Sequence, residues 1–454
     1  MRLIVDNVRC ILTELTLDER RCIRQLLSKS DPRTGFNRGS FDPNKVKTER
    51  FYLENKSGML IFTGLLPEIQ NVLKDSKVSI ENHSTSYSYQ SRDYTYENLR
   101  GYFNPNFSYV EHQIRALREM LKRTKGIVKA TTSAGKTEII LAFIKLTKLK
   151  TIIIAPKVDL ANQLFERARK AGLDVGLMTG SSKKYSGEQV CIATPQMAIA
   201  LSDRDFDCVI CDECHHVCSN TYQDFFKRTK AKVMFGFSAT PDTNKVDFMK
   251  IRQFLGSIIT EIEATELVEH NVIVYPKINF IPISQSNTGD WQSANEDGIM
   301  YNKDRNDKIR ELCEESEKPV LILIRNIEHG KELNKNIPDS IFLSGRDENK
   351  LRNEVFEKYE AEEIGVLIGT YGILSEGISL NSIKTLIIAG GGKSDIQTTQ
   401  ALGRALRSKE GKKEAVIYDF VDMGNKFLEK HSLQRAKIYK QIGFPSEILK
   451  KQVN

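Results

Sequence analysis

The chain has 454 residues, which is enough for two or three domains that each bury a core. Its 40% hydrophobic and 28% charged residues are typical of a soluble globular protein, and no apolar run is long enough to span a membrane. The net charge of +8 suits a phosphate-rich partner without requiring one. Eight cysteines in a chain of this class predict reduced thiols and a cytoplasmic location.

Residues 1–98 predict a small α+β domain. Strands are expected over 3–5, 10–12, 50–54, 59–63 and 78–80, with helices over 17–27 and 66–73. The stretch after the first helix is rich in Gly, Pro and Asn and is interpreted as a loop. Residues 83–96 are rich in Ser, Tyr and Thr, and we interpret them as a linker or exposed loop. Charges within residues 1–9 favour a first strand over a secretory signal.

Residues 99–265 predict a doubly wound α/β domain. Their apolar runs are short and nearly continuous, as expected for parallel strands that are covered on both faces. The runs span 126–129, 151–155, 175–178, 189–193, 208–211 and 232–236. In such a domain the chemistry lies at the carboxyl ends of the strands.

Residues 266–454 predict a second α/β domain. Its strands are expected over 320–324, 340–344, 365–369, 385–389 and 415–419. Residues 284–304, which include the only tryptophan, lack apolar periodicity and are predicted to form a long loop. The basic stretch beyond Met423 is predicted to be a solvated helix packed on this domain.

A cluster of cysteines has the spacing of a zinc site. It contains Cys208, Cys211, Cys214 and Cys218, with His215 and His216 beside them. Residues 208–211 nevertheless predict a buried strand, whose pleat turns Cys208 and Cys211 to opposite faces. A single extended strand does not bring ligands together tetrahedrally, so we interpret these cysteines as core residues.

A phosphate-binding loop is predicted by Gly126-Ile-Val-Lys-Ala130-Thr-Thr-Ser-Ala-Gly-Lys136-Thr137, a strand that leads through a loop into a helix. Lys136 is expected to reach the β and γ phosphates of ATP, and Thr137 to ligate Mg²⁺. The predicted nucleotide-binding residues are Gln113, Thr132, Ser133, Ala134, Gly135, Lys136 and Thr137. Ala130 stands where the generic pattern has glycine.

Gln113 lies upstream of this loop and is placed to read the adenine edge through two hydrogen bonds. Tyr109 or Phe107 would then stack on the ring. The alternative is an ordinary surface glutamine.

Two acidic residues follow the strand at 208–211. Asp212 is expected to hold Mg²⁺, and Glu213 to polarise the attacking water. An acidic pair in a solvated turn is the alternative. Ser238 and Thr240 follow the next strand, and small hydroxyl residues there could relay hydrolysis through hydrogen bonds.

Gln400-Ala-Leu-Gly403-Arg404-Ala-Leu-Arg407 predicts a helical segment with Gln400, Arg404 and Arg407 near one face. The arginines would act as arginine fingers on developing charge at the γ-phosphate. Bracing the end of a helix is the alternative. The predicted catalytic residues are Lys136, Asp212, Glu213, Gln400, Arg404 and Arg407.

Taken together in their order along the chain, these sequence motifs resemble those of the superfamily 2 helicases, over residues 107–420. Asp212-Glu-Cys-His215, Phe235-Gly-Phe-Ser-Ala-Thr240 and Thr370-Tyr-Gly-Ile-Leu-Ser-Glu-Gly377-Ile-Ser look most like the phage UvsW-type branch-migration DNA helicases. The resemblance implies two tandem RecA-like doubly wound parallel-sheet lobes, preceded by a small α+β domain. It also implies that the lobes close on ATP.

The resemblance further implies which residues hold a nucleic-acid backbone. They are Pro156, Lys157, Thr194, Pro195, Gln196, Arg325 and Thr370. Residues 344–346 are a weaker candidate for the same role. The adenine-contacting segment departs from the family pattern, because His112 stands where relatives often have an aromatic residue.

The sequence thus predicts an ATP- and Mg²⁺-dependent DNA helicase or translocase that acts on forked or branched DNA, and on single-stranded DNA, as a monomer with no membrane partner. For a phage protein its place would be the host cytoplasm. Residues 1–98 are a candidate for binding duplex. The alternatives are an RNA helicase or RNA-stimulated ATPase, a restriction-type duplex translocase, and a non-enzymatic nucleotide-binding module.

Overall fold

The computed structural model describes residues 1–37, 40–74, 76–85, 87–105, 109–242, 244–284, 291–374, 380–392, 401–409, 411–441 and 443–444. The chain divides into two compact units, one of residues 1–130 and 135–261 and the other of residues 131–134 and 262–454. Among the described residues, no helix combines the length and the apolar character that crossing a bilayer requires.

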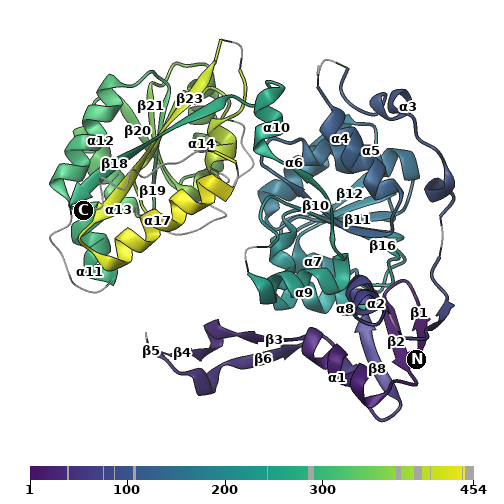
Figure 1. The fold of residues 1–454 in the computed structure, drawn as a ribbon. Coiled ribbons are helices and arrows are strands. Elements are labelled where there is room, and N and C mark those ends of the chain that lie inside the picture. The colour runs from purple at the N-terminus through teal and green to yellow at the C-terminus, as the bar shows by residue number, and fades with distance from the viewer. Residues whose placement is uncertain are drawn as a thin grey trace. The chain divides into compact units, whose positions relative to one another are not determined.

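The first unit begins with a five-stranded sheet (Figure 1). Its strands are β1 (Arg2–Val5), β2 (Arg9–Thr13), β7 (Leu53–Glu54), β8 (Gly58–Phe62) and β9 (Ser79–Asn82), in the order β7-β8-β2-β1-β9. Helices α1 (Leu17–Leu26) and α2 (Leu66–Val72) share a core with one face of this sheet. The predicted strand over 50–54 is interrupted, because Phe51 turns into that core.

A two-stranded arm replaces the loop that was predicted after α1 (Figure 1). Strands β3 (Ser28–Asp31) and β6 (Lys47–Arg50) pair antiparallel, and the short strands β4 (Phe36–Asn37) and β5 (Ser40–Phe41) pair between them. The single turns η1 (Pro32–Gly35) and η2 (Pro43–Lys45) join these strands. The prediction was wrong because β3 and β6 consist of polar residues, which carry no apolar alternation.

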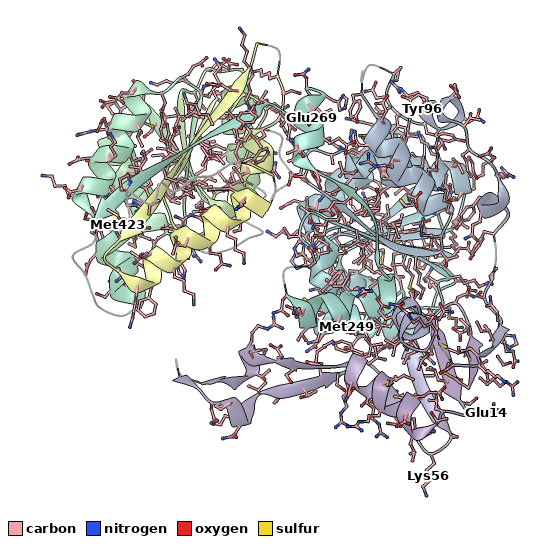
Figure 2. The ribbon with its side chains drawn as sticks, viewed as in Figure 1. Glu14, Lys56, Tyr96, Met249, Glu269 and Met423 are labelled. Atoms are coloured by element: carbon pink, nitrogen blue, oxygen red, sulfur yellow. The ribbon has the colours of Figure 1, made fainter. Side chains whose placement is uncertain are left out.

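Helix α9 (Lys245–Leu255) ties the N-terminal sheet to the rest of the first unit. Its Val246 and Met249 lie in the core of that sheet (Figure 2 labels Met249). Gly64 packs so tightly that an added Cβ would lie 2.1 Å from the carbonyl oxygen of Arg252. The aromatic rings of Phe62 and Phe254 lie 4.5 Å apart.

The predicted linker of residues 83–96 is not an exposed loop throughout. A single turn, η4 (Ser88–Ser91), buries Tyr89, whose ring meets Phe143 edge-on at 6.0 Å. The segment has no aliphatic residues, so its composition predicted exposure, but the aromatic side chain of Tyr89 is buried instead. A short helix, α3 (Tyr96–Arg100), follows.

The main sheet of the first unit has eight strands. They are β10 (Lys125–Ala130), β11 (Thr151–Ile154), β12 (Val175–Met178), β13 (Lys183–Lys184), β14 (Val190–Ala193), β15 (Cys208–Cys211), β16 (Val233–Ser238) and β17 (Ile258–Ile262). Their order is β13-β12-β14-β11-β15-β16-β10-β17, and neighbours from β12 to β10 are parallel. All six predicted runs are strands; the two edge strands, β13 and β17, were not predicted.

Helices cover both faces of this sheet (Figure 1). Helices α4 (Glu111–Leu121), α5 (Lys136–Thr147) and α6 (Val158–Lys170) lie over one face. Helices α7 (Pro195–Ile199), α8 (Asn220–Arg228) and α9 lie over the other.

The cysteines near β15 belong to this interior. Val209 and Cys211 lie in one core cluster, as the predicted pleat requires, and all eight cysteines are free thiols. The part of the chain that the structure describes holds no group of three or more His, Cys, Asp or Glu placed to bind a metal ion.

The second unit is a six-stranded parallel sheet (Figure 1). Its strands are β18 (Tyr275–Ser284), β19 (Val320–Ile324), β20 (Ser340–Leu343), β21 (Val366–Thr370), β22 (Thr385–Ile388) and β23 (Glu414–Met423), in the order β18-β23-β22-β19-β21-β20. All neighbouring strands are parallel. The unit also contains α10 (Ala264–Glu269), α12 (Lys303–Glu315), α13 (Ile327–Asn336), α14 (Asn349–Glu360) and α15 (Tyr371–Leu374).

One prediction for the second unit was wrong, and one was right about the helix and its packing but incomplete. The long loop expected before residue 304 contains helix α11 (Trp291–Asn295) and the π-helical turn η6 (Glu296–Met300), and Ala294 and Ile299 pack against Leu428. The C-terminal helix α17 (Lys426–Gln441) is present but is not simply solvated. Its Arg435 is buried and bonded to the Asp419 carboxylate, so its charge is not on the solvent side.

Candidate active site

Three neighbouring strands of the first unit end at the same edge of the sheet. Cys211 of β15 pairs with Gly236 of β16, and Lys129 of β10 pairs with Ser238 of β16. Because these strands are parallel, the segments that follow them meet at their carboxyl ends. The fold therefore brings together three strings that lie far apart in sequence: the loop after β10, the acidic pair and the Ser-Ala-Thr string.

The loop between β10 and α5 has the backbone of a tight anion-binding turn. Gly135 adopts a left-handed φ of +75°, and an added Cβ would lie 2.0 Å from Nε2 of Gln113. Ser133 also has a positive φ, of +74°. Helix α5 begins at Lys136 with Thr137 in its first turn, so unpaired backbone N–H groups and the positive end of the helix dipole face this loop.

Lys136 forms an ion pair with Glu213, with Nζ 2.8 Å from Oε1. The two side chains are only 14% and 18% exposed. Burial acts to lower the pKa of Lys136, but the carboxylates of Glu213 and Asp212 outweigh it and raise that pKa. Burial acts to raise the pKa of Glu213, but the Lys136 ammonium holds it below its ordinary value. Both groups are therefore charged at neutral pH.

Asp212 behaves differently from its neighbour. Burial and then the charge of Glu213 raise the pKa of Asp212 to about 6. Asp212 directly follows strand β15, and its backbone N–H donates to Ile154 O on β11 at 3.0 Å. A buried carboxylate of raised pKa gains most from a nearby cation, which fits the divalent metal ion that was predicted for this position.

Gln113 is buried against the loop glycine, so it is not an ordinary surface glutamine. On the same helix, His112 stacks on Tyr109, with ring centroids 5.3 Å apart and planes at 25°. A flat pair of rings thus stands beside the predicted adenine-reading side chain. Phe107, the other predicted stacking residue, lies outside the described residues.

His215 is a residue of this site to which sequence reasoning assigned no role. Its Nδ1 lies 2.9 Å from Ser238 Oγ and 3.4 Å from Glu213 Oε2. The backbone N–H of Thr240 donates to the same Ser238 hydroxyl at 3.1 Å. Burial lowers the pKa of His215 to about 4, so the ring is neutral at physiological pH. The signal was its place in Asp212-Glu-Cys-His215, three residues from the carboxylate that was predicted to bind the metal ion.

The predicted backbone-binding residues of the first unit lie on adjacent strand ends. Lys157 precedes α6 after β11, and Thr194 precedes α7 after β14, and these two strands pair in parallel. Lys157 and Gln196 are exposed, whereas Thr194 and Pro195 are buried. Pro156, directly before Lys157, is half-buried.

The second unit repeats this arrangement on its own sheet. Arg325 follows β19 and Thr370 ends β21, and Ile324 pairs with Thr370 across these strands. An added Cβ on Gly392 would lie 2.4 Å from Arg325 Nη1, so that glycine makes room for the guanidinium. The turn at Ser344-Gly345-Arg346 is closed by the Arg346 N–H, which donates to Ser344 Oγ.

The predicted arginine helix is shorter than expected. Among the described residues, 401–405 are helical, but Arg407 forms an isolated antiparallel bridge with Ile273, so the helix does not continue to it. Gln400 lies outside the described residues. Burial, and then the charge of Arg407, lower the pKa of Arg404 to about 9. Its Nε is buried without a hydrogen-bond partner among the described residues, which fits an anion such as a phosphate.

Two family models match the chain in the order of these sites. Residues 106–243 match the type III restriction enzyme, res subunit, and residues 304–409 match the helicase conserved C-terminal domain. The resemblance to superfamily 2 helicases is confirmed. These helicase domains indicate an ATP-dependent enzyme, a hydrolase.

DNA motors are among the proteins to which this chain is similar. It is 23% identical to the DNA 3′-5′ translocase XPB2 of Sulfurisphaera tokodaii, a match covering 69% of this chain and 81% of that protein. It is 24% identical to the ATP-dependent DNA helicase uvsW of Enterobacteria phage T4, over 68% of each. The solved structure of S. cerevisiae Dbp5 bound to RNA and ADP BeF3 matches with a TM-score of 0.53 and 18% identity, over 73% of this chain and 87% of that one. The fold is that of two tandem RecA-like lobes.

Proposed function

We propose that this protein is an ATP-driven DNA motor that unwinds or branch-migrates forked and branched DNA. The observation that carries the proposal is the Lys136–Glu213 ion pair, 2.8 Å long, beside Asp212 at the carboxyl edge of a parallel sheet. A lysine at the start of a helix and two acids after a parallel strand of the same sheet are the groups that ATP hydrolysis requires.

In this proposal the loop residues hold the phosphates. Backbone N–H groups over residues 132–137 and the Lys136 ammonium bind the β and γ phosphates. Thr137 and Asp212 hold Mg²⁺, which neutralises phosphate charge. Glu213 orients and polarises the attacking water, a role that its charged carboxylate suits once Lys136 turns to phosphate.

Arg404 and Arg407, with Gln400, act on the same nucleotide as arginine fingers. The support within the second unit is that Arg404 is buried, has a lowered pKa and has an Nε without a partner among the described residues. An incoming phosphate would satisfy that donor and restore the pKa, so phosphate binding and arginine ordering favour each other.

Ser238 and Thr240 couple hydrolysis to movement through His215. The chain of contacts runs from Glu213 through His215 to Ser238 and the Thr240 backbone. A change at the water-polarising carboxylate therefore reaches the start of α9, which follows this string. Helix α9 also packs in the core of the N-terminal sheet. The contacts that start at Glu213 therefore lead to that sheet.

Nucleic acid would bind to two groups of residues, one at the strand ends of each sheet. Pro156, Lys157, Thr194, Pro195 and Gln196 form the first group, and Arg325 and Thr370 the second. Hydroxyls, helix N-termini and single basic residues bind a phosphate backbone without reading sequence. The exposed Lys157 and Arg325 are suited to this role.

The choice of DNA rests on the relatives. A DNA translocase and a DNA helicase of a phage are among them, and the latter is of the type that the motifs resemble. From these two relatives we infer that the protein acts in phage recombination, repair or replication, as a monomer in the host cytoplasm. Residues 1–98 would contact duplex beside the fork.

Hydrolysis is tested by replacing the ion pair. Lys136→Ala and Glu213→Gln are each expected to lower the rate of ATP hydrolysis by at least about 100-fold, because phosphate binding or water activation is lost. Phosphate release is measured at saturating single-stranded DNA. Lys145→Ala, on the last turn of the same helix, is the matched control and should leave the rate within about twofold. ATP hydrolysis retained in both site variants would place the active site elsewhere, and no ATP hydrolysis by the wild-type protein would favour a non-enzymatic nucleotide-binding module.

The nucleic acid is tested separately by comparing ligands. Single-stranded DNA and forked DNA are expected to stimulate ATP hydrolysis by the wild-type protein more than duplex or RNA of equal length. Stimulation by RNA alone would make the protein an RNA helicase or RNA-stimulated ATPase. Stimulation by plain duplex without strand separation would make it a duplex translocase of the restriction type.

A further inference from the structure

The segment that carries Arg404 and Arg407 ends in carbonyl groups that need partners. Its described helix stops at Ala405. The last carbonyls of a helix have no N–H donor within the helix. Two of the four carbonyls over residues 404–407 accept backbone N–H groups: Arg404 O from Arg407 at 3.3 Å, and Leu406 O from Val274 at 2.8 Å. The carbonyls of Ala405 and Arg407 accept from a side chain instead.

One side chain satisfies both. The Lys412 ammonium donates to Ala405 O at 2.6 Å and to Arg407 O at 3.1 Å. Its third bond, at 3.2 Å, goes to Asn381 O in the segment before β22. An ammonium has three donors, and all three are directed at backbone carbonyls of the second unit. A positive charge at the end of a helix is also favourable to its dipole.

The local backbone explains how Lys412 reaches this position. The Lys412 N–H donates to Lys409 O at 3.0 Å, which closes a reverse turn. Gly411 lies within that turn at a φ of +83°, in the left-handed region that glycine adopts without strain. The turn folds the chain back onto the arginine segment, so that a lysine five residues beyond Arg407 can hold it.

We propose that Lys412 is a positioning residue that fixes Arg404 and Arg407 in the geometry needed for hydrolysis. The inference rests on the proposed role of the two arginines. Lys412 lies outside the matched helicase C-terminal model, which ends at residue 409. Because both carbonyls belong to the backbone that carries the guanidinium groups, losing their common donor lets that backbone shift. A displacement of about 1 Å at a catalytic group can cost on the order of 100-fold in rate.

Lys412 also predicts a pH dependence. Burial lowers the pKa of Lys412 to about 8; the Glu360 charge acts to raise it, and the Lys409 charge to lower it. These are the charged groups that act on it among the described residues. As pH rises through about 8 the ammonium loses a proton, so one of its three donors is lost. The maximal rate should therefore fall above that pH.

The experiment measures kcat and KM for ATP in the full chain with saturating single-stranded DNA, from pH 7 to 9.5. Lys412→Met is expected to lower kcat by about 10- to 100-fold at pH 7.5, with KM changed less than about threefold. Lys409→Met is the matched control, because Lys409 Nζ donates to Glu360 O and Glu362 rather than to the arginine segment. It should keep kcat within about twofold. Lys412→Arg, whose guanidinium stays protonated, should regain part of the rate and lose the decline above pH 8.

Several results would overturn the inference. Lys412→Met could keep a wild-type kcat, or Lys409→Met could lose as much. If Lys412→Met does not fold, the wild-type profile decides, and a kcat that does not fall between pH 7.5 and 9 contradicts the role. Arg404→Ala and Arg407→Ala separate this failure from that of the proposed function. If both keep full activity, the arginine-finger role is wrong; if both lose it and Lys412→Met does not, only the role of Lys412 is wrong.

Discussion

Asp212 and Glu213 are neighbours in sequence, yet the fold shifts the pKa values of their carboxyl groups in opposite directions. Burial and the neighbouring charge raise the pKa of Asp212 to about 6, while Lys136 holds the pKa of Glu213 low. The motif identified both acids and their expected roles. It could not show the two pKa shifts, because that of Asp212 depends on burial and that of Glu213 on the 2.8 Å contact with a lysine 77 residues away in sequence.

Asp212→Asn should make the protein more stable while abolishing hydrolysis. The pKa of Asp212 in the folded state, about 6, exceeds its ordinary 3.8, so the buried charge costs stability above pH 6, and the cost disappears as pH falls toward 4. A gap of about two pH units corresponds to about 1–3 kcal/mol. We expect a higher Tm than wild type at pH 7.5 without Mg²⁺, and little difference at pH 4.5. A lower Tm at pH 7.5 would contradict the burial of this charge.

At the scale of elements, the sequence predicted every strand inside the two large sheets and missed three of their four edge strands, β13, β17 and β18. Interior parallel strands are apolar on both faces, so 208–211 and 320–324 are recognisable without alignment. Strand β13 consists of two lysines, and Thr and Glu interrupt the isoleucines of β17. The arm strands β3 and β6 have no apolar pattern. Helix α17 was predicted, but its buried Arg435–Asp419 pair was not, because a basic tail resembles a solvated one.

The junction between the N-terminal sheet and α9 gives the prediction at this scale. Gly64→Ala places a Cβ against the Arg252 carbonyl, where the added atom would lie 2.1 Å from the oxygen, so backbone must move. We expect a loss of about 1–3 kcal/mol in the free energy of unfolding, measured by urea denaturation.

Gly101→Ala is the matched control for this substitution. Gly101 has a right-handed helical backbone, and an added Cβ would have nothing within 4 Å. Its unfolding free energy should stay within about 0.5 kcal/mol of wild type. Equal effects of the two substitutions would argue against tight packing on α9.

For the whole molecule, the order of the motifs predicted two RecA-like lobes, and each lobe places its predicted residues along the carboxyl edge of its own sheet. What sequence could not supply were residues whose roles come from contacts alone. His215 contacts Ser238, and Lys412 holds the arginine segment, through distances that no local pattern encodes. Residue identity thus predicts the chemistry that we propose, and the fold adds the contacts through which other residues would position it.

The central claim is that ATP hydrolysis drives movement on DNA, and strand separation tests it most directly. Wild-type protein and Glu213→Gln are mixed with labelled forked, four-way-junction and plain duplex DNA, with and without ATP and Mg²⁺. We predict that wild type separates or migrates the forked and four-way substrates only with ATP. Glu213→Gln should bind them without separating them. ATP hydrolysis without strand separation or migration on any of these substrates would contradict the account.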